Sequence, residues 1–212
     1  MRSALARIAV PALALLLTGA DDPTRFALPP SPPPFALPAD SVLFSDDFSG
    51  GLGKWAPDSV TAWSAWRHML RADLPDRKQA RSFLFAGSEE WRDYALDFDV
   101  CGMRGVDKGG AIRVLGTAGF AVDLRGGGYQ DIVAHIREWP VGRARVTNAN
   151  ATWSHVRIEA KGDRFRVYVN GDLRIQRSDA RRPNGRIALA AYTGGVGKFT
   201  AYYDNVVVTL LK

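Results

Sequence analysis

The chain has 212 residues, of which 46% are hydrophobic and 24% charged, a composition typical of a folded globular protein rather than a disordered one. Its formal net charge of +6 favours acidic partners such as phosphates, anionic lipids or acidic glycans, without selecting among them. Cys101 is the single cysteine, which excludes an internal disulfide and predicts a buried, unreactive thiol.

Residues 1–20 have the pattern of an export sequence. Arg2 and Arg7 precede thirteen uncharged, mostly apolar residues from Ile8 to Ala20. This arrangement is typical of a secretory signal peptide, and the apolar run is short for a membrane-spanning helix, which needs about 20 residues. We expect export to the periplasm or cell envelope, with residues 1–20 either cleaved or retained as a membrane anchor.

Residues 21–40 form a proline-rich arm. Clustered prolines disfavour helices and central strands, and they favour an extended, polyproline-like spacer. The arm also carries four apolar side chains within a repeated FALP sequence: Phe26, Leu28, Phe35 and Leu37. Two interpretations stay open, because these side chains can lie on the domain's own surface or bind another protein, such as a membrane-protein complex.

Residues 41–212 alternate short apolar runs with glycine-rich turns and show no convincing helical period. Turn sequences at residues 161–163 and 170–172 separate alternating runs and predict two β-hairpins. Residues 58–81 are the least strand-like, and we expect a long loop or one helical turn there. Many short strands with such turns indicate an all-β sandwich or barrel.

Residues 111–139 contain the candidate binding surface. Ile132, Ala134 and Ile136 alternate with polar residues, as in a strand with one buried face. The preceding runs alternate too, so antiparallel pairing brings one set of side chains to an open face: Arg113, Asp123, Arg125, Tyr129, Asp131, His135, Arg137 and Trp139. Aromatic rings match the apolar faces of sugars, and charged planar groups bind paired hydroxyls. The set predicts a carbohydrate-binding surface, and the alternative is an ordinary array of cross-strand ion pairs.

Three stretches of the domain occur in a characteristic order: LFSDDFSGGLGKW, WSHVRIEAKGDRFRVYVNGDLRI and GKFTAYYDNVVV. Together they resemble the concanavalin A-like jelly rolls of the laminin-G and lectin type, in particular the bacterial 3-keto-disaccharide hydrolase-like branch, over residues 42–210. The resemblance implies a two-sheet antiparallel jelly-roll sandwich, with one concave sheet and with adjacent first and last strands. It also implies binding of, or action on, sugars and glycoconjugates.

The resemblance bears on catalysis and on metal binding. Related jelly-roll glycosidases carry a Glu-x-Asp-x-x-Glu motif on one strand, and the nearest match here, residues 97–102, lacks both glutamates. Asp97 and Asp99 are instead expected on the solvated face of a half-buried strand. Related jelly rolls often hold a structural calcium near the paired terminal strands, where Asp47 and Asp204 are expected, and the alternative is that these carboxylates bind turn amides.

No sequence feature supports a nucleophilic triad or a zinc site, because a Gly-x-Ser-x-Gly elbow is absent and no histidine has a partner at metal-ligand spacing. The sequence therefore predicts an exported, non-catalytic recognition module with carbohydrate as its ligand. The alternative is an accessory or structural subunit of a membrane-associated complex, whose many arginines suit an anionic membrane surface. A glycoside-processing enzyme rests on the resemblance alone, and nucleic acid is not an expected partner.

Overall fold

The computed structural model describes residues 27–35 and 41–212, apart from residues 138 and 196. Phe26 and Leu37 of the predicted arm, and all of residues 1–20, lie outside the described residues. The described strands are β1 (Val42–Asp46), β2 (Ala56–Pro57), β3 (Trp63–Trp66), β4 (Met69–Leu74), β5 (Arg81–Ala86), β6 (Tyr94–Arg104), β7 (Asp107–Leu115), β8 (Ala118–Arg125), β9 (Asp131–Ile136), β10 (Trp139–Arg145), β11 (Trp153–Lys161), β12 (Arg164–Val169), β13 (Asp172–Ser178), β14 (Arg186–Tyr192) and β15 (Phe199–Leu210).

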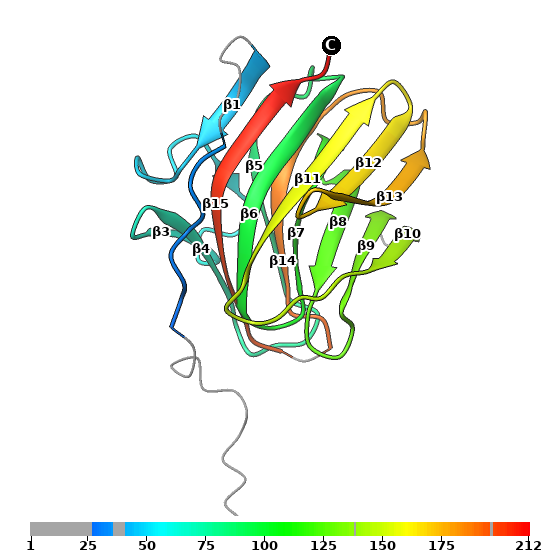
Figure 1. Ribbon diagram of the computed structural model, residues 1–212. Helices are drawn as coiled ribbons and strands as arrows, with labels where there is room; N and C mark the ends of the chain where they lie inside the picture. Colours follow the sequence, from blue (N-terminus) through cyan, green and yellow to red (C-terminus); the bar gives the residue numbers. More distant parts are fainter. Residues whose placement is uncertain (1–26, 36–40, 138, 196) are drawn as a thin grey trace, which may run out of the picture.

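These strands form two antiparallel sheets that pack face to face (Figure 1). The eight-stranded sheet has the order β13-β12-β11-β6-β15-β4-β3, with β1 also paired to β15, and it faces the viewer in Figure 1. The seven-stranded sheet behind it has the order β10-β9-β8-β7-β14-β5-β2. The protein is therefore the jelly-roll sandwich that the sequence predicts, and the pairing of β1 with β15 confirms that the first and last strands are adjacent.

The core fills the space between the two sheets with the inward-facing half of each alternating strand. Ile132 and Ala134 are fully buried, as their alternation predicts. The rings of Phe120 and Phe165, from opposite sheets, stack with their centroids 4.4 Å apart. Full burial of a side chain of this size stabilises the fold by about 2–3 kcal/mol, so such pairs fix the spacing of the sheets.

The hairpins predicted from turn sequences are present, since β11 pairs with β12 and β12 pairs with β13. Asn170 and Gly171 have φ values of 51° and 85° at the second turn, a conformation that this dipeptide adopts readily. The expectation of a loop or helical turn at residues 58–81 is wrong, because β3 and β4 form a hairpin there. Its turn uses Arg67 and His68 at φ values of 49° and 59°, in place of the Gly, Asn or Asp that usually marks such a turn in sequence.

Within the described part of the chain, no helix is long and apolar enough to cross a membrane.

Candidate functional site

A groove of about 480 Å³ lies on the outer face of the seven-stranded sheet and crosses β5, β14, β7 and β8. It is hollow because small residues meet along neighbouring strands. Ala111 of β7 lies opposite Ala188 of β14 on one side and opposite Ala121 of β8 on the other. Ala190 continues this row along β14. Methyl groups leave room above the sheet that larger side chains would fill.

The floor of the groove is apolar and aromatic at the β5 side. Phe83 and Phe85 occupy alternate positions on β5, so both point away from the core that holds Leu84. Their ring centroids are 6.0 Å apart, and the Arg186 guanidinium lies 4.4 Å from the Phe85 centroid. These two rings and the neighbouring alanines form an apolar cluster separate from the main core.

The rim of the groove is polar at both ends. Arg81 of β5 and Tyr192 of β14 lie opposite each other in register at one end. Asp123 of β8, His135 of β9 and Arg137 line the other end. The His135 ring is fixed from both nitrogens, because Nε2 lies 2.7 Å from Asp123 Oδ2 and Nδ1 lies 2.6 Å from the Arg137 carbonyl oxygen.

A second polar cluster adjoins the groove along β8 and β9. Arg125 and Asp131 lie directly opposite in register, and the guanidinium donates two hydrogen bonds of 2.7 Å to the carboxylate. The Tyr129 ring covers this pair, with its centroid 4.3 Å from the Arg125 guanidinium carbon. Arg143 of β10 also approaches the Asp131 carboxylate at 3.3 Å.

Asp107 lies on β7 between these two groups of residues, opposite Tyr192 on one side and Arg125 on the other. Its Oδ1 atom is buried without a hydrogen-bond partner among the described residues. Burial, reinforced by the nearby Asp123 carboxylate, raises the pKa of Asp107 to about 7. The next residue, Lys108, is 4% exposed, and burial lowers the pKa of its amine to about 8.

The structure divides the predicted binding set. Asp123, His135 and Arg137 line the groove, while Arg125, Tyr129 and Asp131 form the adjoining cluster. Trp139 is 76% exposed at the start of β10 and is not part of the groove wall.

The placement of Arg113 on this open surface is wrong, because its side chain is 1% exposed. The pairing of β7 with β8 shifts between Ile112 and Leu115, and Arg113 adopts a φ of 49° at this irregularity. Its guanidinium lies near the Phe165 ring of the core, 5.2 Å from the centroid, and binds backbone carbonyls. Arg113 is therefore a structural residue.

Sequence reasoning missed Arg81, Phe83, Phe85, Tyr192 and Asp107. The stretch RSFLFAG contains a detectable signal, because Phe83 and Phe85 lie on the strand face opposite the apolar Leu84, which indicates that the outer face is also covered or used. The alanines of β7 and β14 carry no such sign, since they form a hollow only once the strands are paired.

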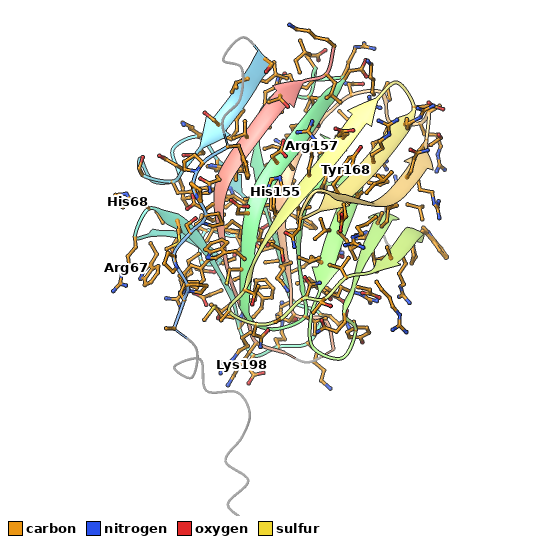
Figure 2. All side chains as sticks on the ribbon, viewed as in Figure 1. Arg67, His68, His155, Arg157, Tyr168 and Lys198 are labelled. Carbon is orange, nitrogen blue, oxygen red and sulfur yellow. The ribbon has the colours of Figure 1, made fainter. Side chains whose placement is uncertain are left out.

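The outer face of the eight-stranded sheet carries a second cluster of charges. His155 of β11 lies between two carboxylates of β6, with Nε2 3.1 Å from Asp97 Oδ1 and Nδ1 3.2 Å from Asp99 Oδ1. Arg157 donates a 2.5 Å hydrogen bond to Asp97, and Figure 2 shows His155 and Arg157 on this face. Burial opposes protonation of His155, but the two carboxylates outweigh it and raise its pKa to about 9. The expectation that Asp97 and Asp99 are solvated is wrong, because they are 4% and 1% exposed.

The proline-rich arm covers part of this face, which explains the burial. In Figure 1 the described part of the arm, in blue, runs beside β15. Leu28 packs against a cluster that contains Cys101, Met103 and Tyr202, and the Phe35 ring lies 4.3 Å from the His155 ring. Of the two interpretations of the arm, contact with the domain's own surface therefore describes Leu28 and Phe35. Cys101 is buried as predicted, and burial raises the pKa of its thiol to about 11.

The two predicted calcium ligands do not fit a metal site in the described residues. Asp47 accepts hydrogen bonds from the amide and hydroxyl of Ser49, which lower its pKa. Asp204 accepts from the Ser31 hydroxyl and the Asn205 amide, while burial raises its pKa. Among the described residues no group of three or more His, Cys, Asp or Glu side chains is placed to hold a metal ion. The turn-amide alternative describes Asp47, whereas Asp204 lies on β15 and binds the Ser31 hydroxyl of the arm and the amide of its neighbour Asn205.

The strand order and the structural neighbours described below give the domain a concanavalin A-like jelly-roll fold. The family of 3-keto-alpha-glucoside-1,2-lyase-like domains matches residues 54–209, and the chain belongs to this family. No curated protein sequence matches the chain.

Several solved structures share this fold. Carbohydrate-binding module CBM66 from Bacillus subtilis superposes with a TM-score of 0.63 at 18% identity, covering 74% of this chain and 95% of that one. The exoplasmic/lumenal domain of VIP36, in a form bound to Ca²⁺ and Man3GlcNAc, gives 0.58 at 12% identity and covers 76% and 85%. Crh5 transglycosylase in complex with NAG gives 0.62 at 12% identity and covers 80% and 85%. At these identities the similarity establishes the fold, and the neighbours include both binding proteins and enzymes.

Proposed function

We propose that this protein is an exported, non-catalytic carbohydrate-recognition module whose glycan lies in the groove of the seven-stranded sheet. One observation carries the proposal: the groove combines a floor of Phe83, Phe85 and alanines with polar side chains at both ends. Such a floor suits the apolar face of a sugar ring, and fixed charged groups bind its hydroxyls. The jelly-roll neighbours that bind carbohydrate support the same ligand class.

The fixed geometry of the rim supports recognition. His135 is held by Asp123 and by a backbone carbonyl, so little side-chain entropy is lost when a hydroxyl group binds beside it. The hollow lies on strands rather than on loops, which keeps the positions of its donors and acceptors constant. A preformed groove of this kind is typical of small-ligand sites.

A glycan array followed by titration calorimetry tests the proposal. We expect Phe83→Ala and His135→Ala each to weaken the best glycan by about tenfold or more, which corresponds to about 1.4 kcal/mol. Trp139→Ala is the matched aromatic control, because Trp139 is exposed but outside the groove, and it should leave binding unchanged. Loss of binding on Trp139→Ala with no effect of Phe83→Ala would move the site to the β9–β10 hairpin and refute the groove.

Asp107 favours a second candidate function, acid–base catalysis on a sugar at the edge of the groove, because it lies opposite the groove residue Tyr192 although it does not line the groove itself. A carboxyl whose pKa is about 7 exchanges protons readily at neutral pH, and its Oδ1 has no partner among the described residues. Asp123, whose Oδ2 lies 2.7 Å from His135 Nε2, is close enough to raise the pKa of Asp107 further. The family description names a lyase, which requires such proton transfer.

Turnover distinguishes this candidate from pure recognition. Glycosides and their 3-keto derivatives are incubated with the protein, and release of the free sugar is followed by mass spectrometry. Release that is abolished by Asp107→Asn, while glycan binding is retained, would make the protein an enzyme. Binding without release by either form would support the recognition module.

A further inference from the structure

Residues 27–33 of the proline-rich arm contact the eight-stranded sheet with a period of three residues. Residues 27, 30 and 33 are exposed, whereas residues 28, 29, 31 and 32 between them are half-buried. The pattern ends at residue 34, which is exposed, and residue 35 is half-buried again. A polyproline II helix has three residues per turn, and the prolines of this segment fix φ close to the value it requires. The arm therefore presents two of its three edges to the sheet, as a bound polyproline peptide does.

The backbone of the arm is recognised at the same interval. The Trp153 indole Nε1 donates a 3.0 Å hydrogen bond to the carbonyl oxygen of Pro29. The Asn205 Nδ2 donates a 2.9 Å hydrogen bond to the carbonyl oxygen of Pro32, three residues further on. Prolines have no N–H group, so their carbonyls are the only backbone groups a partner can bind. An aromatic N–H and an amide placed one polyproline turn apart match this requirement.

The side chains on the buried edges each meet a matching surface. Leu28 contacts the apolar cluster at one end of the site. Ser31, three residues later, donates a 2.5 Å hydrogen bond to the Asp204 carboxylate. Phe35 packs against His155 with their ring centroids 4.3 Å apart. The sheet thus contacts an apolar, a hydroxyl and an aromatic side chain in a fixed order along the arm.

We propose that the outer face of the eight-stranded sheet is a binding site for an extended proline-rich peptide, and that residues 27–35 of this chain occupy it as a ligand. The ligand class is defined by the register: an apolar residue, a hydroxyl residue three positions later and an aromatic residue four positions after that, joined by prolines. The site lies on the sheet opposite the groove, so the peptide and the proposed glycan do not compete for the same surface.

Binding of a free peptide to the full chain tests this site. The probe is a fluorescein-labelled peptide of residues 27–35, and the receptor is the full chain with the substitutions Leu28→Asp and Phe35→Asp, which disable its own arm. Fluorescence anisotropy should show saturable binding to this open-arm variant. The unmodified chain should bind the peptide at least about tenfold more weakly, because its tethered arm competes at millimolar effective concentration.

Peptide variants distinguish sequence-specific binding of the peptide from nonspecific binding. Ser31→Ala in the peptide should weaken binding about 3- to 10-fold, since one hydrogen bond to a carboxylate is lost. Pro33→Ala is the matched control, because residue 33 is exposed, and it should bind like the parent peptide. Equal weakening by both changes, or equal binding of the peptide to the open-arm and unmodified chains, would overturn the proposal.

A second measurement guards against a damaged open-arm variant. The indole proton of Trp153 should exchange slowly with solvent in the unmodified chain, because Pro29 accepts its hydrogen bond. It should exchange fast in the open-arm variant and slow down again when the peptide is added. An indole proton that stays protected without the arm, or that the peptide fails to protect, would show that this face does not bind the segment.

Discussion

Replacing Arg113 with methionine removes a buried guanidinium while keeping most of the aliphatic stem. The Nε atom donates to the carbonyl of Arg92 at 2.9 Å, and Nη1 donates to the carbonyls of Gly162 and Arg182 at 2.6 and 2.7 Å. Nη2 pairs with Asp93 at 3.0 Å. This one side chain therefore joins β7 to the loop before β6, the β11–β12 turn and the loop before β14.

The expected cost follows from the acceptors that lose their donor. A buried carbonyl left unsatisfied costs about 1–3 kcal/mol. Asp93 is 41% exposed, so water can replace the lost guanidinium there, and the Asp93 ion pair contributes little to the total cost. We expect Arg113→Met to lower the free energy of unfolding by about 3–4 kcal/mol. This loss is a large part of the free energy of unfolding of a typical domain, which is about 5–15 kcal/mol.

Urea unfolding followed by tryptophan fluorescence measures this change. Arg143→Met is the matched control, because its side chain is 61% exposed and makes an ion pair of the surface type, expected to contribute less than about 1 kcal/mol. Arg113→Lys keeps the charge but loses the planar fork, so we expect a loss of about 2 kcal/mol. The reasoning is refuted if Arg113→Met costs less than about 1 kcal/mol, or no more than Arg143→Met.

Three further predictions concern charge. Because the pKa of His155 is raised to about 9, its contribution to the free energy of unfolding is complete below about pH 6.5. This contribution, up to about 3 kcal/mol, should be lost as pH rises through 9. In urea titrations at a series of pH values, His155→Gln should abolish this pH dependence. Because the pKa of Asp107 is raised to about 7, the free energy of unfolding should fall as pH rises from about 4 to 7. The free energy of unfolding of Asp107→Asn should exceed that of the parent protein by about 2–4 kcal/mol at pH 8, and the two should be equal at pH 4. Chelation with EGTA should leave the Tm unchanged, since Asp47 and Asp204 bind protein donors; a drop of several degrees would reveal bound calcium.

The sandwich could be predicted from the sequence because it rests on local patterns. Alternation placed Ile132 and Ala134 in the core, and the residues around Gly162 and Gly171 marked two hairpins. The β3–β4 hairpin was not predicted because its turn places Arg67 and His68 at positive φ without the Gly, Asn or Asp that usually marks a hairpin turn. Figure 2 shows both side chains at the outer edge of the molecule.

The candidate site could be predicted only in part, because outer faces depend on contacts between distant segments. Asp123 and His135 were identified from alternation in neighbouring strands, but Phe83 comes from β5, which β7 and β14 separate from β8 in the sheet. Asp99 was expected in water, and the arm that shields its face is attached through Ser31 to the last strand. Arg113 points inward because the β7–β8 register shifts at this position, and the alternation of apolar and polar residues in the sequence does not reveal such a shift.

The arm and the groove occupy opposite outer faces of the sandwich, and this fixes how the domain can be displayed. Ala27, the first described residue, lies on the eight-stranded side, and the arm is held there through Pro29, Pro32 and Phe35. A surface joined to the domain through the arm therefore leaves the groove of the seven-stranded sheet pointing into solution. Immobilisation through the N-terminal side should preserve ligand capture, whereas random coupling through lysines would orient only a fraction of the molecules productively.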